Sequence, residues 1–397
     1  MIRLFSDFWI MGRVFVYLLL TVSCAESNTD SAASETCEAI GVFETVAETA
    51  PAHVDELVEF HVTFDTEGRV HYCYFGYDGD EAVSYYGKDT GDYFFKEERV
   101  LLEESPVVCG GLAVARDGTP YLLSKQPASM VLKTDGAWTG VELDGLSASG
   151  AASALRGEDT VVSLSRAGKD GVFLSMSLGF QTANQPMYGA KITPDGLTLL
   201  FNGYVEDENP TIVGYGPQLL ETYDDVRLIV GRVFQFSVVL ADADLEILSE
   251  TAGRYPRAAA NEDGEARALY LNQNNELLVN TFEDAELVSL GKLGTVSPGE
   301  HAPGHLPWEL TVDDEGTTHV LFEDASQGEN ALLYQKMDAD GNTELPRVIS
   351  NTLVSELPGN GHYAITLDSC GLPVAAIVAM SDETAAARPR LRIVQER

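Results

Sequence analysis

The sequence predicts an all-β fold, a seven-bladed β-propeller, and three observations support this prediction. An alternating apolar run, a turn containing Asp or Gly, and a second alternating run recur seven times along the chain. The turn aspartates recur about every 50 residues, the spacing expected for one four-stranded blade. The last copy is one strand short, and a segment before the first copy has the pattern of the missing strand.

The seven copies share one hairpin pattern, in which Asp accepts hydrogen bonds from its own turn and Gly adopts a positive φ. They cover residues 61–75, 112–123, 152–165, 190–201, 258–271, 309–322 and 364–377. Their turn aspartates are Asp65, Asp117, Asp159, Asp195, Asp263, Asp313 and Asp368. We therefore expect these aspartates to be structural and not catalytic.

The amino-terminal residues predict export. Arg3 and Arg13 precede an apolar run over residues 14–22, which is too short to span a bilayer and is typical of a signal peptide, residues 1–23. The Ser23-Cys24 ending resembles a bacterial lipobox, in which the cysteine is diacylated. We expect lipidation of Cys24 and a membrane-anchored lipoprotein at the periplasmic or outer cell surface; release of a soluble protein by ordinary cleavage is the alternative.

The remainder of the chain divides into a tether and one domain. Residues 24–39 are rich in Ser, Ala, Thr and Glu without apolar periodicity, which is typical of a flexible linker. Residues 40–397 form the predicted propeller, a closed array that accounts for this length as a single domain and that we expect to be monomeric. Because the formal net charge is −37, the surface repels phosphate backbones and excludes nucleic-acid binding. Contact with a membrane is expected only through the lipid anchor.

Individual blades are predicted by strand pattern and turn chemistry. Strands are expected at 58–65, 69–75, 81–89 and 93–102 in the first blade, at 112–117, 120–125, 130–134 and 138–143 in the second, and at 309–313, 317–323, 331–337 and 346–349 in the sixth. The seventh has strands at 364–368, 373–379 and 390–395. Residues 41–46 would supply its outer strand, so that the two ends of the chain close the ring without an exposed edge.

Four cysteines besides Cys24 allow three disulfide pairings in an oxidising compartment. In a four-stranded blade the turn after strand one and the entry to strand four lie on the same face. This geometry favours a bond between Cys37 and Cys370 in the closing blade, with Cys73 and Cys109 joining the first blade to the second. Four buried free thiols are the alternative.

The runs VFETVAE, HVTFDTEGRVHYCYF and AVSYYGKDTGDYFFKEERV resemble the repeat of bacterial secreted seven-bladed propellers. In that repeat an "ETV" outer strand leads to "slalDsdGnpHisYyd" and then "LkYa…W". The resemblance covers residues 42–143 and 305–349. It implies the fold alone, because those proteins are mostly uncharacterised envelope or extracellular proteins. Sialidase propellers share the architecture, but this chain has few arginines and no S-x-D-x-G-x-x-W box.

Residues 206–232 depart from the repeat because they are too many for a plain connection between blades. They predict either a long loop over a binding surface, with Tyr215, Pro217 and Tyr223 suited to that role, or an elaborated third strand followed by a surface hairpin.

No motif of a known active site occurs in the chain, since G-x-S-x-G, H-E-x-x-H and C-x-x-C are all missing. Weak catalytic or zinc candidates are Glu300, His301, His305 and His362, with His53 at a comparable blade entry. Hydrogen-bonded loop or channel residues are the alternative interpretation. The acidic runs at 78–81, 206–209 and 338–344 offer oxygen ligands for calcium but lack a complete twelve-residue loop. We therefore expect no cofactor or metal, with calcium or zinc as the alternative.

The predicted function is a non-catalytic cell-envelope binding or scaffolding module whose partner is an envelope protein or a glycan. The alternative is a glycan hydrolase or lyase with its site at the mouth of the central channel; a purely structural surface protein is a third possibility. Aromatic residues gather in the first blade between Tyr72 and Phe95. They predict core packing, with a sugar-stacking platform as the alternative.

Overall fold

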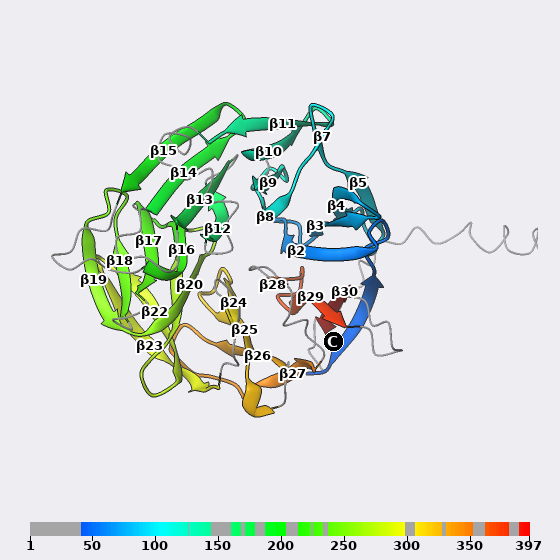
Figure 1. Cartoon of the computed structure of the whole chain (residues 1–397). Helices are drawn as coiled ribbons and strands as arrows, with labels where there is room; N and C mark the ends of the chain where they lie inside the picture. Colours follow the sequence, from blue (N-terminus) through cyan, green and yellow to red (C-terminus); the bar gives the residue numbers. More distant parts are fainter. Residues whose placement is uncertain are drawn as a thin grey trace, which may run out of the picture. The chain divides into compact units, whose positions relative to one another are not determined.

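The computed structural model divides the chain into two units, Met1–Glu38 and Ala39–Arg397. It describes residues 41–125, 127–143, 160–167, 171–178, 187–203, 213–223, 225–232, 237–297, 306–327, 331–351, 362–380 and 389–397, all in the second unit. These residues form seven four-stranded antiparallel sheets, which are the seven blades of a β-propeller (Figure 1). The predicted fold class is confirmed.

The blades follow one another along the chain. Blade 1 contains β2 (Glu56–Phe64), β3 (Val70–Asp78), β4 (Glu81–Asp89) and β5 (Phe95–Arg99). Blade 2 contains β8 (Cys109–Val114), β9 (Pro120–Lys125), β10 (Ala128–Thr134) and β11 (Ala137–Glu142). A small ribbon of β6 (Leu101–Leu102) and β7 (Ser105–Pro106) lies between them in the chain. Blade 3 contains β12 (Thr160–Ala167), β13 (Gly171–Leu178), β14 (Met187–Thr193) and β15 (Gly196–Gly203).

Blade 4 contains β16 (Val213–Glu221), β17 (Val226–Arg232), β18 (Ser237–Ala241) and β19 (Ile247–Ala252). Blade 5 contains β20 (Arg254–Ala260), β21 (Ala266–Leu271), β22 (Glu276–Glu283) and β23 (Glu286–Thr295). Blade 6 contains β24 (Trp308–Val312), β25 (Thr318–Glu323), β26 (Leu332–Met337) and β27 (Arg347–Ser350), with a 3-10 turn η1 (Ala325–Gln327). Blade 7 contains β28 (Tyr363–Leu367), β29 (Pro373–Met380), β30 (Pro389–Glu396) and, as its outer strand, β1 (Phe43–Thr49).

The first strands of the blades form the inside of the ring. β2, β8, β12, β16, β20, β24 and β28 contact one another in this order, and β28 contacts β2 again (Figure 1). The core consists of seven hydrophobic clusters, each made by two neighbouring blades. Side chains alternate between the two faces of a strand, so each blade contributes apolar residues to both neighbours. Burial between blades therefore holds the ring together.

The predicted closure of the ring is confirmed, because β1 pairs antiparallel with β30 from Phe43↔Glu396 to Thr49↔Leu391. The predicted strands of blades 1, 2, 6 and 7 are present with boundaries shifted by a few residues. Each of these blades is built from local hairpins with strong alternation, which is the signal that a sequence shows most clearly.

Two of the seven predicted first hairpins are wrong. The first hairpin of blade 3 is β12–β13 and not residues 152–165, of which 152–159 lie outside the described residues. Residues 190–201 belong to β14 and β15, the third and fourth strands of the same blade. An Asp-Gly turn suits any of the three hairpins in a blade, so the turn alone does not number the strands.

Both predictions for residues 206–232 are wrong for the described part of the segment, while residues 206–212 and 224 lie outside the described residues. The described part of this segment forms β16 and β17, the first hairpin of blade 4. Its turn closes with a hydrogen bond from the Thr222 N–H to the Asp225 carbonyl, 2.9 Å, and lacks glycine. A search for Asp/Gly turns misses it, although the flanking runs QLLE and VRLIV are rich in apolar residues.

The turn aspartates are structural in the blades where the pattern is complete. Asp65 Oδ1 accepts the N–H groups of Glu67 and Arg69, at 3.0 and 2.9 Å. Asp313 and Asp368 make the same pair of bonds in blades 6 and 7. In blade 5 the equivalent residue is Asn261, two positions before Asp263, and in blade 2 it is Ala115, two positions before Asp117.

A disulfide joins Cys73 of β3 to Cys109 of β8, with Cα atoms 6.5 Å apart, and so links blade 1 to blade 2. Cys370 is also disulfide-bonded; Cys24 and Cys37 lie outside the described residues. Within the described ranges, no helix has the length and apolar character needed to cross a membrane.

Candidate functional site

A ring of polar side chains lies on the first strands, at one level of the propeller axis. In each blade this position is four residues before the residue that pairs across the first hairpin turn, which is Asp65 in blade 1. It is occupied by His61, Gly111, Ser163, Gln218, Arg257, Glu309 and Ala364 in blades 1 to 7. We call the five polar members, His61, Ser163, Gln218, Arg257 and Glu309, the axial ring.

Hydrogen bonds connect members of the axial ring from different blades. Arg257 Nε donates to Glu309 Oε2 at 3.0 Å, and Arg257 Nη1 donates to Ser163 Oγ at 3.4 Å. Arg257 of blade 5 thus reaches both its neighbour blade 6 and the more distant blade 3. Its side chain is 15 % exposed and that of Glu309 is 21 % exposed, so solvent reaches this pair. Gln218 instead makes two hydrogen bonds to the backbone of Ala258. Its Nε2 donates to the Ala258 carbonyl, and its Oε1 accepts the Ala258 N–H.

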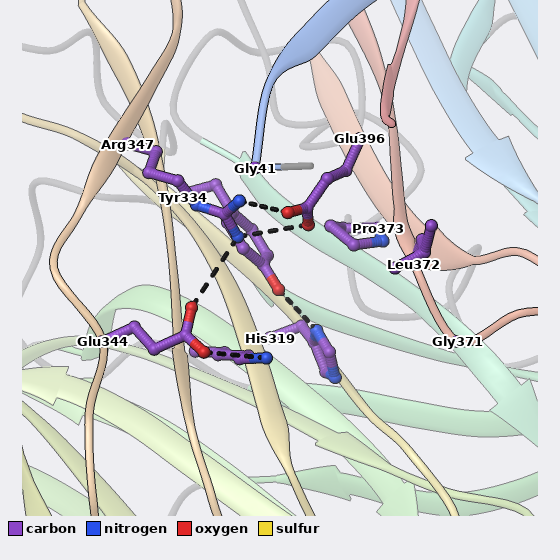
Figure 2. Close-up of a pocket in the computed structure, with 10 residues that line it drawn as sticks. Gly41, His319, Tyr334, Glu344, Arg347, Gly371, Leu372, Pro373 and Glu396 are labelled. Atoms are coloured by element: carbon purple, nitrogen blue, oxygen red, sulfur yellow. Dashed lines mark hydrogen bonds and ion pairs between the residues drawn. The ribbon is translucent and has the colours of Figure 1, made fainter. Parts of the chain in front are cut away.

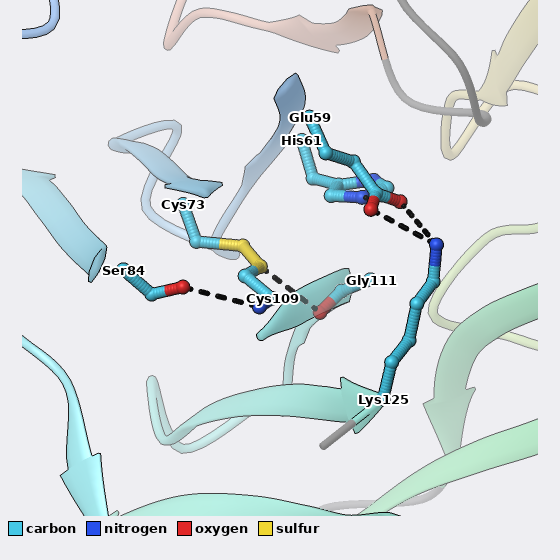
Figure 3. The surroundings of a disulfide bond; sticks show 7 residues. All are labelled: Glu59, His61, Cys73, Ser84, Cys109, Gly111 and Lys125. Atoms are coloured by element: carbon cyan, nitrogen blue, oxygen red, sulfur yellow. Dashed lines mark hydrogen bonds and ion pairs between the residues drawn. A yellow bond between two sulfur atoms is a disulfide. The ribbon is translucent and has the colours of Figure 1, made fainter. Parts of the chain in front are cut away.

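A charged cluster adjoins the ring at the junction of blades 1 and 2 (Figure 3). Glu59 Oε1 lies 3.0 Å from His61 Nε2, and Lys125 Nζ donates to both carboxylate oxygens of Glu59 at 2.9 Å. Glu59 and His61 are buried, whereas the side chain of Lys125 is 32 % exposed. Lys125 is the last residue of β9, so the cluster lies at the end of the ring opposite the first hairpin turns.

The disulfide lies directly behind this cluster. Cys73 is the cross-strand partner of His61, and Cys109 is the cross-strand partner of Ser124, next to Lys125. Figure 3 shows the bond, which joins β3 and β8, the neighbours of the strands β2 and β9 that carry the cluster. A Cβ at Gly110 would come within 2.5–2.9 Å of the Lys125 side chain, so a larger residue there would force this lysine to move away from β8.

The carboxylates of the site are already neutralised by cations. Burial raises the pKa of Glu59, but the bonds from His61 and Lys125 more than offset it and leave the pKa below its ordinary value. Glu59 is therefore ionised at neutral pH and is no proton donor there. Glu309 is paired with Arg257. The site presents fixed charges and hydrogen-bonding groups, which is chemistry suited to binding a polar ligand.

The residues predicted from sequence mostly do not form this site. Glu300, His301 and His305 lie outside the described residues. His362 is buried just before β28, where its carbonyl accepts the N–H of Val378 at 2.7 Å. His53 stacks on Tyr85 and lies 3.4 Å from Glu97 of the outer strand β5, away from the inner strands.

No group of three or more His, Cys, Asp or Glu residues able to hold a metal occurs among the described residues. Asp338, in one of the acidic runs considered for calcium, instead accepts the N–H groups of Asp340 and Asn342 in its own turn. Residues 206–209 lie outside the described ranges. Most aromatic residues of blade 1 are in the core, and Tyr72 and Tyr74 donate to Glu97; Phe94 is 72 % exposed.

A second arrangement, an Asp–His–Tyr triad, occurs in two blades. In blade 1, His71 Nε2 lies 3.1 Å from Asp65 Oδ2 and His71 Nδ1 lies 2.6 Å from the Tyr86 hydroxyl. In blade 6 the corresponding distances are 3.2 Å for His319 with Asp313 and 2.8 Å for His319 with Tyr334.

Both triads hold a neutral histidine. Burial lowers the pKa of His71 and of His319, more than the nearby aspartates raise it. Burial also raises the pKa of Tyr86 and of Tyr334, so each hydroxyl stays protonated and donates to Nδ1, while Nε2–H donates to Asp. A network that recurs at the same positions of two blades belongs to the repeat, and we interpret it as structural.

Beside the blade 6 triad is a cavity of about 250 Å³ between blades 6 and 7. His319, Tyr334, Arg347 and Glu396 lie along it (Figure 2). Arg347 pairs with Glu396 and also lies over the ring of Tyr334, 5.0 Å from its centroid. Its charged groups are paired with one another, as are those of the axial ring, and we regard this cavity as a second candidate for a ligand site.

Reasoning from the sequence missed the axial ring. The signal that would find it is the residue four positions before each first turn, but it can be read only when all seven first hairpins are aligned. That alignment was wrong in blades 3 and 4, and so Ser163 and Gln218 could not be assigned to this level.

No family model matches the chain, and no curated protein matches it in sequence. Solved structures match it in fold. A streptogramin B lyase aligns with a TM-score of 0.55 and 12 % identity, over 91 % of this chain and 100 % of the lyase. A virginiamycin B lyase from Staphylococcus aureus aligns with a TM-score of 0.52 and 11 % identity, over 89 % and 99 %.

A structure of YCF48 bound to a D1 peptide aligns with a TM-score of 0.44 and 14 % identity, over 89 % of this chain and 94 % of that chain. These structural neighbours are seven-bladed propellers. At such low identities the likeness establishes the fold and no activity.

Proposed function

We propose that this protein is an exported, lipid-anchored propeller that acts as a non-catalytic binding or scaffolding module of the cell envelope. The ligand is part of an envelope protein or glycan, and it contacts the axial ring and the cluster of Glu59, His61 and Lys125.

The observation that carries this proposal is the saturation of the charged groups. Glu59 is bonded by Lys125 and His61, and Glu309 is bonded by Arg257, so the site offers fixed hydrogen-bonding groups and no unpaired carboxylate base. The Cys73–Cys109 disulfide is compatible with an oxidising compartment outside the cytoplasm. The predicted signal and Cys24 supply the anchor.

The test is in-cell crosslinking of the full chain, followed by mass spectrometry. We expect one recurrent partner with the wild type. The yield of this partner should fall in Cys24→Ala, because the protein leaves the membrane, and in Arg257→Gln, because the axial ring is broken.

The matched control is Arg254→Gln, on the same strand as Arg257, where Arg254 Nη2 donates to Asn275 Oδ1 at 2.6 Å outside the ring. It should leave the crosslink unchanged. An equal loss in both arginine variants, or only abundant bystanders with the wild type, would contradict the proposed site.

The second candidate is a propeller enzyme. It is favoured by a buried histidine beside a carboxylate at the ring axis, in a fold shared with two lyases. Incubation of the purified protein with isolated envelope glycans and with virginiamycin B, followed by mass spectrometry, tests it. Turnover that is lost in His61→Gln would establish the enzyme; intact substrates with the wild type would reject it for these substrates.

A further inference from the structure

Two arginines, Arg116 and Arg166, extend to the other end of the ring axis, where the first hairpin turns lie; we call this the turn end. Arg116 is in the first turn of blade 2, and its Nη2 donates to the carbonyl of Glu262 in the first turn of blade 5, at 3.1 Å. Blades 2 and 5 are not neighbours in the ring. The side chain of Arg116 therefore crosses the axis.

Arg166 reaches the same end from blade 3. Its Nη2 donates to the carbonyl of Phe64 at 2.6 Å and its Nε donates to the carbonyl of Val114 at 3.3 Å. Phe64 and Val114 are the last residues of β2 and β8. Arg166 thus extends from blade 3 past blade 2 to blade 1, toward the position that Arg116 crosses.

The charges of this pair are not neutralised by contact. Neither Arg116 nor Arg166 has a carboxylate within 4 Å in the described part of the chain, and of the other arginines described only Arg254 shares this property. This is unexpected in a chain with 62 acidic and 25 basic residues. Ion pairs are the ordinary state of its arginines.

Charges that are not in contact with the pair also act on Arg166. Burial lowers the pKa of Arg166; Asp65 and Glu262 oppose this effect, and Arg116 adds to it by repulsion. Asp65 is itself bonded by Arg69 and His71, and its attraction for Arg166 is larger than the repulsion from Arg116. A bound anion would relieve the repulsion between the two guanidinium groups.

Donors remain for such an anion. A guanidinium has five N–H groups, and the hydrogen bonds described above use two in Arg166 and one in Arg116. Part of the Arg166 residue is accessible to solvent, although its guanidinium group is enclosed enough for burial to lower its pKa. The planar guanidinium group presents pairs of N–H donors that match the oxygen atoms of a carboxylate or phosphate group. We propose that Arg116 and Arg166 form a binding site for one carboxylate or phosphate group at the turn end of the axis.

The site goes beyond the proposed envelope role and does not depend on it. The two are also tested separately, since anion binding is measured on the purified protein and the envelope partner is found in cells. A failure of one leaves the other measurement unaffected. The formal net charge of −37 disfavours large polyanions, and a single anionic group is the occupant that this field tolerates best.

The experiment is isothermal titration of the purified protein with inorganic phosphate and, separately, with acetate. Ionic strength is held constant at about 0.15 M, where the Debye length is about 8 Å and the surface charge is largely screened. We expect saturable 1:1 binding of at least one of the two anions. Binding of phosphate alone would identify a phosphate group as the occupant, and binding of acetate alone a carboxylate.

Arg166→Gln and Arg116→Gln should each weaken the affinity about ten-fold or more, the effect of losing about 1.4 kcal/mol. Arg254→Gln, which lacks an ion pair but lies away from the turn end, should bind as the wild type does. Arg116 is in a surface turn, so its variant tests the proposal even if Arg166→Gln fails to fold. Absence of saturable binding to the wild type, or equal affinity in Arg116→Gln, would overturn the proposal.

Discussion

The junction of blades 1 and 2 and the junction of blades 6 and 7 use the same set of positions with different residues. In both, an Asp–His–Tyr triad in the first blade meets an aromatic side chain from the outer strand of the next blade. Trp138 packs edge-on against Tyr86, with ring centroids 5.2 Å apart, and Phe43 packs edge-on against Tyr334 at 5.4 Å. Tyr86 and Tyr334 therefore have the same kinds of neighbours at the two junctions.

An ion pair lies beside each tyrosine, and the positions of its acidic and basic residues are exchanged between the two junctions. Glu98, opposite Tyr86 in blade 1, pairs with Lys133 of blade 2 at 2.7 Å. At the equivalent positions, Arg347, opposite Tyr334 in blade 6, pairs with Glu396 of blade 7. The pairs also differ in solvent access, since Glu98 is 32 % exposed and Glu396 only 6 %.

This difference shows how similar blades can be kept in their correct order. If blade 6 packed against blade 2, Arg347 would meet Lys133, and the two cations would repel each other. Apolar packing alone would not distinguish the two arrangements, because both junctions bury the same kinds of residue. A further difference is that a disulfide crosses the junction of blades 1 and 2.

The largest expected effect concerns that disulfide. The double variant Cys73→Ala and Cys109→Ala removes a link between residues separated by 36 positions. The chain-entropy model predicts a loss of about 4 kcal/mol in the free energy of unfolding. Urea unfolding followed by fluorescence measures it. An unchanged midpoint would mean that apolar packing alone holds this junction.

The next effect separates the two ion pairs. Arg347→Ala should cost about 3 kcal/mol, because it leaves the buried carboxylate of Glu396 unpaired. Lys133→Ala should cost less than about 1 kcal/mol, because Glu98 remains hydrated. Equal losses for the two variants in urea unfolding would show that burial does not distinguish the junctions.

The two triads should differ in the opposite direction, with the larger loss in blade 1. His71→Leu leaves Asp65 and the Tyr86 hydroxyl without their shared partner, and both are buried, so we expect a loss of about 2 kcal/mol. His319→Leu should cost about 1 kcal/mol, because Asp313 is 22 % exposed and can be hydrated. A larger loss for His319→Leu in urea unfolding would reverse this ranking of the two blades.

The smallest effect is a dependence on pH. The pKa of each triad histidine is lowered in the folded state, so below about pH 6.5 the unfolded chain binds protons that the folded chain does not. Stability should therefore fall between pH 7.5 and pH 5. The double variant His71→Leu and His319→Leu should lose less over this range, as measured by urea midpoints at the two pH values. An equal loss in wild type and variant would exclude the triads as its source.

Much of the fold follows from local sequence. Alternating apolar residues set the strands and Asp/Gly turns set the hairpins, both within about ten residues of chain. This is why the strands of blades 1, 2, 6 and 7, the first hairpin of blade 5 and the closing strand β1 were predicted correctly. In blades 3 and 4 the turns lack this chemistry or place it in a later hairpin, as at Asp195-Gly196, and the strand numbering failed.

The sequence by itself determined the all-β class, the repeat and the closure of the ring, because strand period and turn conformation depend on neighbouring residues. Only the tertiary structure decided what meets at the axis. The bond from Arg257 to Ser163 and the bond from Arg116 to Glu262 each join blades that are not neighbours. Such contacts arise when the ring closes, since closure brings together side chains that are far apart along the chain.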